Sequence, residues 1–545
     1  MNNKIGFTVG GTYSKGVLVK LEETSHEEIE IGHSLIAKGK QRKYLMITND
    51  VIADSDAAAS TVNMSRKPMF AKDMITDTLL TSKINCIPIA SSTSKEVEDA
   101  RTIPDYLSEC YLLTPEEAWS FYGACDMEIR YPLGTIKPLD FKVPIDVDTL
   151  IQNSFGIFGK SGTGKSVLGN LIAAYIVLYS NHIKNTKLAS IPSVLLIFDM
   201  HSEYGLKLKT PTQQVLAPGI AETFPEEFRV YCVDPELVDE IDKEFRRGTL
   251  ASELKIQKKN IEVEDIVVLS ELLNISGIGA LNLYAVKNRL EELDKTWFDA
   301  LLNFDNFDYN VLKSKFDMQV ITSLRAFSRR LEPFKHFSQI TDENDTCQEL
   351  INDLKENKNV VVTFGRYGDS EILYMFVVNY ISRRLRDEYV SKGLMEGTKN
   401  RIIIFVEEAH KFLNPQVRGS SPLGLIAREL RKRGIVLCVI DQTPSQIDEN
   451  VFGMVWNFFI GATSIDRDVE VPTRTLKLPE LFKPLVTSLR KQEFLAYGSA
   501  IKFPAVVKVM EYRSQMAELR RIYESKYKPD LSEYSKSLTK ALNSD

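Results

Sequence analysis

The clearest chemical signal in the sequence is the glycine-rich segment GKSGTGKS, which covers residues 159–166. It fits the pattern G-x-x-x-x-G-K-[ST], in which glycines let backbone N–H groups converge on phosphate oxygens. We predict that Lys165 contacts the β- and γ-phosphates of ATP and that the Ser166 hydroxyl binds Mg²⁺. The other predicted nucleotide-binding residues are Gly159, Ser161, Gly162, Thr163, Gly164 and Val167.

The surroundings of this segment favour a phosphate loop over a chance glycine-rich turn. An apolar stretch, SFGIF, precedes it and an apolar-rich stretch, SVLGNLIAAYIVLYS, follows it. These patterns predict a buried strand before the loop and a helix after it, and the positive end of that helix attracts an anion.

A site that hydrolyses ATP also needs carboxylates at the ends of neighbouring strands. The segment IIIFVEEAH places Glu407 and Glu408 after an apolar run. We assign Glu407 to Mg²⁺ and Glu408 to activation of the attacking water; the alternative is an ordinary strand end with solvated acids. A second strand end, LLIFDMHSEYG, carries Asp199, which we predict to support the metal, with support of the water as the alternative.

Two further segments suggest a sensor and an arginine that acts between subunits. VLCVIDQTP ends in Gln442, whose amide could sense the γ-phosphate or hold water; the alternative is a turn before Pro444. AREL RKRG contains Arg431, our preferred candidate for an arginine inserted into a neighbouring site, with Arg428 and Arg433 as alternatives. A solvated basic helix face is the competing interpretation of this segment.

The elements that would position these residues begin at about residue 150, where continuous apolar strands alternate with helices. This alternation predicts an α/β fold with a parallel sheet covered on both faces. Short strand-like segments predict a small β-barrel before it, and YPLGTIKPLD, residues 131–140, is a predicted linker. The predicted domains are 1–145 (β-rich), 146–239 and 346–512 (core), 240–345 (helical insertion) and 513–545 (helix and tail).

Bulk composition excludes some classes of protein. The net charge of −6 argues against a surface that coats nucleic acid, although a narrow basic channel is compatible with it. The 6 cysteines are scattered, which fits a reducing compartment and indicates no zinc site. No run approaches the roughly 18–20 apolar residues that span a bilayer, and the start lacks a secretory pattern. We therefore expect a cytoplasmic protein that is not in a membrane.

Taken in order, the segments GKSGTGKS, DMHSEYG, VEEAHKF, RELRKRGI and DQTPSQI resemble the HerA family of hexameric DNA translocases, in the HerA–FtsK branch of P-loop ATPases. The resemblance covers about residues 150–510 and extends to the N-terminal domain, which is similar to the barrel before the HerA core. It implies a RecA-like ATPase core in a homohexameric ring around duplex DNA. Glu408 would be the catalytic acid and Gln442 a sensor. Departures from the family pattern at Leu430 and Arg433 leave the choice of arginine open.

The resemblance also implies a partner protein. HerA-like proteins work with a NurA nuclease in DNA end resection, or with Sir2-like or nuclease effectors in anti-phage defence. Because this chain has no evident nuclease motif, such an effector would be a separate polypeptide docked on the N-terminal domain. Two alternatives stay open: a nucleotide-dependent ring scaffold that regulates an effector, and a conjugation- or secretion-type ATPase.

Overall fold

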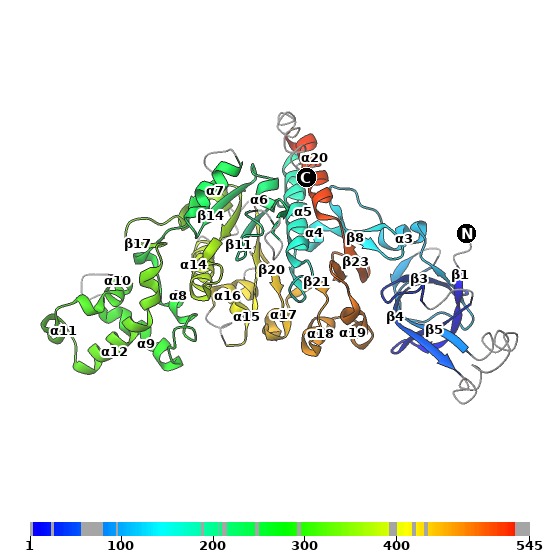
Figure 1. The fold of residues 1–545 in the computed structure, drawn as a ribbon, viewed down its shortest axis with the longest axis horizontal. Helices are drawn as coiled ribbons and strands as arrows, with labels where there is room; N and C mark the ends of the chain where they lie inside the picture. Colours follow the sequence, from blue (N-terminus) through cyan, green and yellow to red (C-terminus); the bar gives the residue numbers. More distant parts are fainter. Residues whose placement is uncertain are drawn as a thin grey trace. The chain divides into compact units, whose positions relative to one another are not determined.

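The structure is a computed structural model, and it falls into two compact units (Figure 1). The first unit contains residues 1–168, 442–445 and 456–511, and the second contains residues 169–441, 446–455 and 512–545. The residues that the structure describes are 4–22, 27–55, 80–93, 96–186, 190–206, 208–209, 215–245, 250–290, 296–391, 400–416, 421–429 and 434–528. The units are not the predicted domains, whose borders stay predictions.

The first unit begins with an antiparallel barrel, as predicted. Its strands run in the order β2-β1-β7-β3-β4-β5-β6, and pairing of β2 with β5 closes the barrel. Alternating apolar side chains such as Val19, Met46 and Ile84 fill the interior. The bounds are β1 Lys4–Thr12, β2 Gly16–Leu21, β3 Ser34–Lys38, β4 Lys43–Ser55, β5 Leu80–Ser92, β6 Val97–Asp99 and β7 Glu109–Leu112.

The rest of the first unit is a run of strands in the order β10-β21-β22-β23-β8-β9. The linker predicted at residues 131–140 is wrong, because residues 130–136 form β8, which pairs antiparallel with β23. Tyr131, Leu133 and Ile136 are buried there, and that burial outweighs the proline and glycine that suggested a linker. The bounds are α3 Pro115–Tyr122, β8 Arg130–Ile136, β9 Phe141–Asp146, α4 Val147–Leu150, β10 Ser154–Phe158, β21 Val455–Gly461, α18 Asp466–Thr473, α19 Pro479–Ser488, β22 Glu493–Gly498 and β23 Ala505–Val509.

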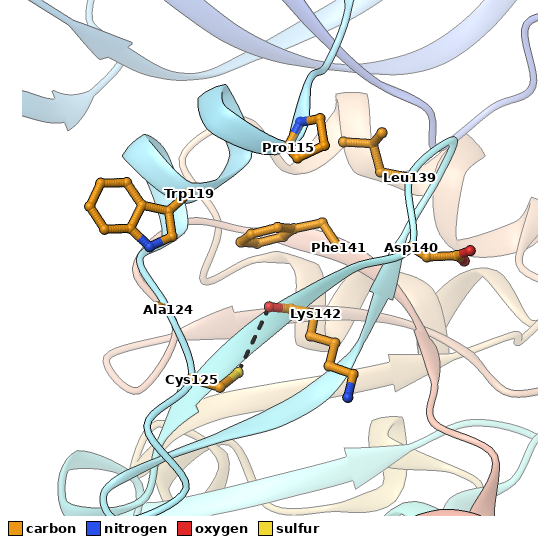
Figure 2. A pocket seen from close by; sticks show the side chains of 8 residues that line it. All are labelled: Pro115, Trp119, Ala124, Cys125, Leu139, Asp140, Phe141 and Lys142. Atoms are coloured by element: carbon orange, nitrogen blue, oxygen red, sulfur yellow. Dashed lines mark hydrogen bonds between the residues drawn. The ribbon is translucent and has the colours of Figure 1, made fainter.

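A shallow pocket of about 510 Å³ lies beside α3 in the first unit (Figure 2). Its lining includes Trp119, which is 62% exposed, and Phe141 at the start of β9. Neither residue belongs to the predicted nucleotide site, so the pocket takes no part in the chemistry considered below.

The second unit contains a parallel run of strands in the order β15-β14-β18-β11-β19-β20. The strands predicted from the apolar runs before Asp199, Glu407 and Asp441 are confirmed. Their side chains are almost all buried, as expected for a sheet covered on both faces. The strands are β11 Ser193–Asp199, β14 Phe228–Cys232, β15 Ala251–Glu253, β18 Asn359–Thr363, β19 Arg401–Val406 and β20 Ile435–Asp441. The helices around them are α6 Ile220–Thr223, α7 Glu236–Phe245, α13 Cys347–Lys355, α14 Glu371–Ser391, α15 His410–Leu413, α16 Pro422–Glu429, α17 Glu449–Phe452 and α20 Tyr512–Tyr527.

The insertion between β14 and β18 is mainly helical, as predicted. Short strands were missed there: β15 extends the parallel sheet beside β14, and two-residue strands β16 and β17 pair with each other. Strands of two or three residues carry no readable periodicity. The elements are α8 Val263–Val267, α9 Gly277–Leu290, α10 Trp297–Leu302, α11 Tyr309–Lys315, α12 Met318–Arg330, β16 Ile256–Gln257 and β17 Ile340–Thr341.

A buried ion pair fastens the insertion to α14, and its loss should destabilise the second unit. Arg383 Nε donates to Asp265 Oδ1 over 2.8 Å, and the two side chains are 7% and 0% exposed. Asp265→Ala would leave the guanidinium buried without this partner, so we expect a loss of about 3–5 kcal/mol. Thermal unfolding measures the loss. Asp305→Ala, which breaks the exposed pair with Arg325, should cost under ~1 kcal/mol; equal losses would contradict the prediction.

Among the described helices, α5, Lys165–Thr186, is long and apolar enough to cross a membrane by length and composition, with a mean hydropathy of 1.2 over 18 residues. The expectation that no segment approaches this length was therefore wrong. Of that window, 83% is buried inside the protein, as in the core helix of a globular domain. The helix also begins at the lysine of the phosphate loop.

Candidate nucleotide site

The phosphate loop lies in the first unit, between β10 and the start of α5. Three of its glycines have left-handed φ angles: 145° at Gly159, 77° at Gly162 and 101° at Gly164. Residues with a side chain rarely adopt these angles, so the glycine spacing is a requirement of the backbone path. The loop has the conformation that its sequence pattern predicts.

Hydrogen bonds hold the loop around the lysine. Lys165 Nζ donates to the carbonyl oxygen of Gly159 over 2.7 Å and to that of Lys160 over 3.2 Å. Thr163 Oγ1 donates to the same Lys160 oxygen over 2.8 Å, and the Lys160 N–H donates to Ala462 O over 3.0 Å. The ammonium therefore lies within the curl of the loop, where a bound phosphate would meet it.

The remaining predicted loop residues are placed consistently with an anion site. Ser166 and Val167 follow Lys165 in the first turn of α5 and are half-buried, whereas Ser161 and Gly162 are exposed. The N-terminal N–H groups of a helix this long favour a negatively charged ligand. The loop geometry thus fits the phosphates of a nucleotide, and the predicted contact of Ser166 with a cation stays a prediction.

The acidic residues lie in the second unit, along one edge of its parallel strands. Asp199 ends β11, Glu407 and Glu408 follow β19, and Asp441 ends β20. Since β11, β19 and β20 are neighbours and run parallel, their carboxyl ends meet at the same edge. The strand ends that carry Asp199, Glu407 and Glu408 thus lie side by side, and the roles predicted for these residues stay predictions.

Asp199 stabilises the loop that follows β11 by accepting hydrogen bonds from its backbone. Its Oδ1 accepts the N–H of Glu203 over 2.7 Å, and its Oδ2 accepts those of Tyr204 and Gly205 over 3.1 and 2.7 Å. Burial raises the pKa of Asp199 to about 7, against the opposing effect of these hydrogen bonds. This bonding is a structural role, and the predicted metal role of Asp199 stays a prediction.

Glu407 is the acid best suited to a cation. Its carboxyl group is buried, and burial, followed by the nearby charges of Asp199, Glu203 and Glu408, raises its pKa well above the ordinary value. The backbone N–H of His201 donates to it. Within the described part of the chain, Glu407 Oε2 has no hydrogen-bond partner. A buried oxygen without a donor among several acids fits Mg²⁺, which would supply the missing positive charge.

Glu408 has a strained backbone that its neighbours enforce. Its φ is +48°, in the left-handed region. On one side, Tyr374 Oη donates to the carbonyl oxygen of Glu407 over 2.8 Å; on the other, the N–H of Ala409 donates to Ile440 O over 3.3 Å. Strain of this kind costs about 1–3 kcal/mol and clusters at active sites. The geometry marks Glu408 as the chemically important member of the acid pair.

His410 and Asp441 were not predicted as site residues, although they belong to the segments VEEAHKF and DQTPSQI. Asp441 is buried, and its Oδ2 accepts the backbone N–H of His410 over 2.6 Å. The ring nitrogen Nδ1 of His410 lies 3.0 Å from the same oxygen and 3.6 Å from Glu408 Oε2. Ligand atoms of these three residues lie within 4.8 Å of one another, so a cation could also bind there. His410 thus links the ends of β19 and β20.

The His410–Asp441 contact should stabilise the protein more at low pH. Burial alone would lower the pKa of His410, but the hydrogen bond with Asp441 and the charge of Glu408, opposed by Lys411, raise it above the ordinary value. The stabilisation is complete below the unfolded pKa of about 6.5 and is lost as pH rises through the higher folded pKa.

Melting temperatures of the wild type and His410→Asn between pH 6 and 9 test this prediction, with His182→Asn as the control for removing a histidine. The advantage of the wild type over His410→Asn should shrink as pH rises. An advantage that grows with pH would contradict the prediction.

The predicted sensor, Gln442, lies within the described residues, whereas the preferred arginine, Arg431, does not. Gln442 immediately follows β20, is half-buried and belongs to the first unit, like the phosphate loop. Arg431 and Arg433 lie outside the described residues, so both stay predictions. Arg428 is exposed on α16, where its Nε donates to Gly424 O over 3.3 Å.

Residues 131–385 match the family described as the central domain of the helicase HerA. This part of the chain is therefore similar to the HerA central domain. Residues outside that match extend the similarity: the chain is 24% identical over 411 residues to the "DNA double-strand break repair helicase HerA" of Sulfolobus acidocaldarius, covering 74% of this chain and 73% of that protein.

The protein of the same description from Pyrococcus furiosus is 24% identical over 426 residues, covering 72% of this chain and 71% of that one. Among solved structures, the plasmid coupling protein TrwB in complex with the non-hydrolysable GTP analogue GDPNP is similar with a TM-score of 0.46 and 13% identity, covering 73% of this chain and 93% of that one. The similarity to HerA rests on the sequence matches.

Proposed function

We propose that the protein is an ATP-driven translocase or helicase of double-stranded DNA that works as a homohexameric ring. The observation that carries the proposal is the strained backbone of Glu408 in a chain that also contains a phosphate loop, because a protein that only bound nucleotide would not need a positioned catalytic acid. The sequence relatives are described as DNA double-strand break repair helicases, which supports DNA as the substrate.

In this proposal, separate side chains bind the nucleotide, hold the metal and activate the attacking water. Lys165 and the loop N–H groups hold the β- and γ-phosphates, and Gln442 contacts the γ-phosphate. Glu408 orients the attacking water and takes its proton as the water attacks the γ-phosphorus. Ser166 and Glu407, with Asp199 in support, would hold Mg²⁺, which when bound neutralises phosphate charge. Arg431 of a neighbouring subunit would stabilise the transferring phosphoryl group.

The biological setting is part of the same proposal. The protein would act in the cytoplasm with a partner nuclease, a Sir2-like protein or another effector that docks on the N-terminal barrel. The work of the ring would then be DNA end processing or anti-phage defence. The absence of a nuclease motif from this sequence is the reason for placing that chemistry on another polypeptide.

DNA-stimulated hydrolysis is the direct test. We expect duplex DNA to increase ATP turnover of the wild type, and Lys165→Ala to abolish turnover with and without DNA. Native mass spectrometry should show six copies, and mixing Arg431→Ala with Lys165→Ala subunits should restore part of the activity. If duplex DNA does not stimulate hydrolysis and the protein retains no DNA at moderate salt, the proposed translocase function would be contradicted and the ring scaffold favoured.

A further inference from the structure

A short turn next to the phosphate loop has an unusual backbone. The turn, residues 490–493, connects α19 to β22 within the first unit. Gln492 in this turn has a φ of +64°, in the left-handed region that residues with side chains rarely adopt. Such a conformation costs roughly 1–2 kcal/mol and persists only where the surroundings enforce it.

The strained residue contacts the phosphate loop directly. The backbone N–H of Gln492 donates to Thr163 O over 2.8 Å, and Gln492 O accepts the N–H of Val509 over 2.9 Å. Its side chain covers the next loop residue: a methyl group at Gly164 would come within 3.2 Å of Gln492 Cγ. The turn therefore supports the loop at the Thr163–Gly164 peptide, just before the lysine.

The orientation of that peptide follows from elementary geometry. In a trans peptide the C=O and N–H groups point in opposite directions. Because the Thr163 carbonyl points at Gln492, the N–H of Gly164 must point away from the turn. In a phosphate loop, N–H groups of this kind bind the phosphate oxygens. The bond from Gln492 thus orients one of the donors that a nucleotide needs.

Ion pairs tie the other end of the turn to the barrel. Arg490 Nη2 donates to Glu30 Oε1 over 2.9 Å, and Glu30 precedes barrel strand β3. Lys137, which follows β8, lies 2.8 Å from Glu493 Oε1 and 3.2 Å from Glu30 Oε2. The hydrogen bonds from Arg490 and Lys137 lower the pKa of Glu30, so it stays charged. Each partly exposed pair contributes little energy, but together they fix the position of the turn.

We propose that Gln492 is a positioning residue for bound nucleotide and that the 490–493 turn couples the N-terminal barrel to the phosphate loop. A partner on the barrel would then alter ATP affinity by moving this turn. The inference rests on the proposed use of ATP and is independent of DNA, because nucleotide affinity is measured without DNA.

Two substitutions of Gln492 separate the backbone role from the side chain. Gln492→Gly and Gln492→Val both remove the carboxamide, but only glycine accepts the left-handed φ without strain. We expect Gln492→Val to weaken binding of a fluorescent ATP analogue about tenfold or more, and Gln492→Gly to stay within about threefold of the wild type. If Gln492→Val does not fold, Gln492→Ala should give an intermediate loss. Equal losses for the glycine and the bulkier variant would overturn the positioning role.

The coupling is tested by Glu30→Gln, which breaks both ion pairs of that carboxylate. We expect a two- to fourfold change in ATP affinity, with kcat unchanged when ATP saturates the enzyme. In the Gln492→Val background the same substitution should have no further effect, since the contact it acts through is already lost. Glu98→Gln, which breaks the barrel pair with Arg42, is the matched control. Additive effects of Glu30→Gln and Gln492→Val, or equal effects of Glu30→Gln and Glu98→Gln, would overturn the coupling.

Discussion

Glu408→Gln is expected to lower ATP turnover by about 10²–10⁴-fold, the range that a positioned general base contributes, while ATP still binds. The amide cannot take the proton of the attacking water, yet it has nearly the shape of the carboxylate. Because glutamine bears the same backbone cost at a φ of +48° as glutamate, the melting temperature should change little. Single-turnover hydrolysis and equilibrium binding of a fluorescent ATP analogue measure the two quantities separately.

Glu203→Gln is the matched control for this experiment. Glu203 is another acid at the same edge of the sheet, where its charge helps raise the pKa of Glu407. We give Glu203 no part in proton transfer, so its variant should retain turnover within a few-fold of the wild type. Turnover by Glu408→Gln above a tenth of the wild-type rate would assign the proton to another group, and His410, 3.6 Å from Glu408, would be the first to examine.

The sequence predicted the parts of this protein that depend on local patterns. The glycine spacing at 159 and 164 follows from the backbone path of the loop, and the buried strands before Asp199, Glu407 and Asp441 follow from continuous apolar runs. The acid edge could be predicted as well, because neighbouring parallel strands end at a common edge. A barrel was expected because several short strand-like segments follow one another near the N-terminus.

The sequence could not show the contacts that join distant segments. Nothing near position 492 indicates that its N–H meets Thr163 O, since the partner lies more than 300 residues earlier. The three bonds that Asp199 accepts depend on how the loop to Gly205 curls, so its structural role was not visible either. Residues 131–140 were misread because proline and glycine outweighed the buried side chains of β8.

Lys165→Ala should weaken ATP binding by about 10–100-fold. A hydrogen bond to a charged group contributes about 1.5–3 kcal/mol, and each 1.4 kcal/mol corresponds to about tenfold in affinity. The loop carbonyls of Gly159 and Lys160 now accept hydrogen bonds from the ammonium. Without it, these oxygens would face the phosphates with no positive charge between them, which adds repulsion to the lost attraction.

Lys160→Ala separates this effect from a general loss of positive charge. Lys160 belongs to the same loop and is exposed. Its backbone makes these loop contacts: its N–H donates to Ala462 O, and its carbonyl accepts from Lys165 and Thr163. Alanine at this position keeps those backbone bonds, so ATP affinity should stay within about threefold. The stabilisation of each variant by ATP gives an independent measure, because it depends on the ratio of ligand concentration to Kd. If both variants lost affinity equally, net charge near the loop would explain binding, and the position of Lys165 inside the curl would not.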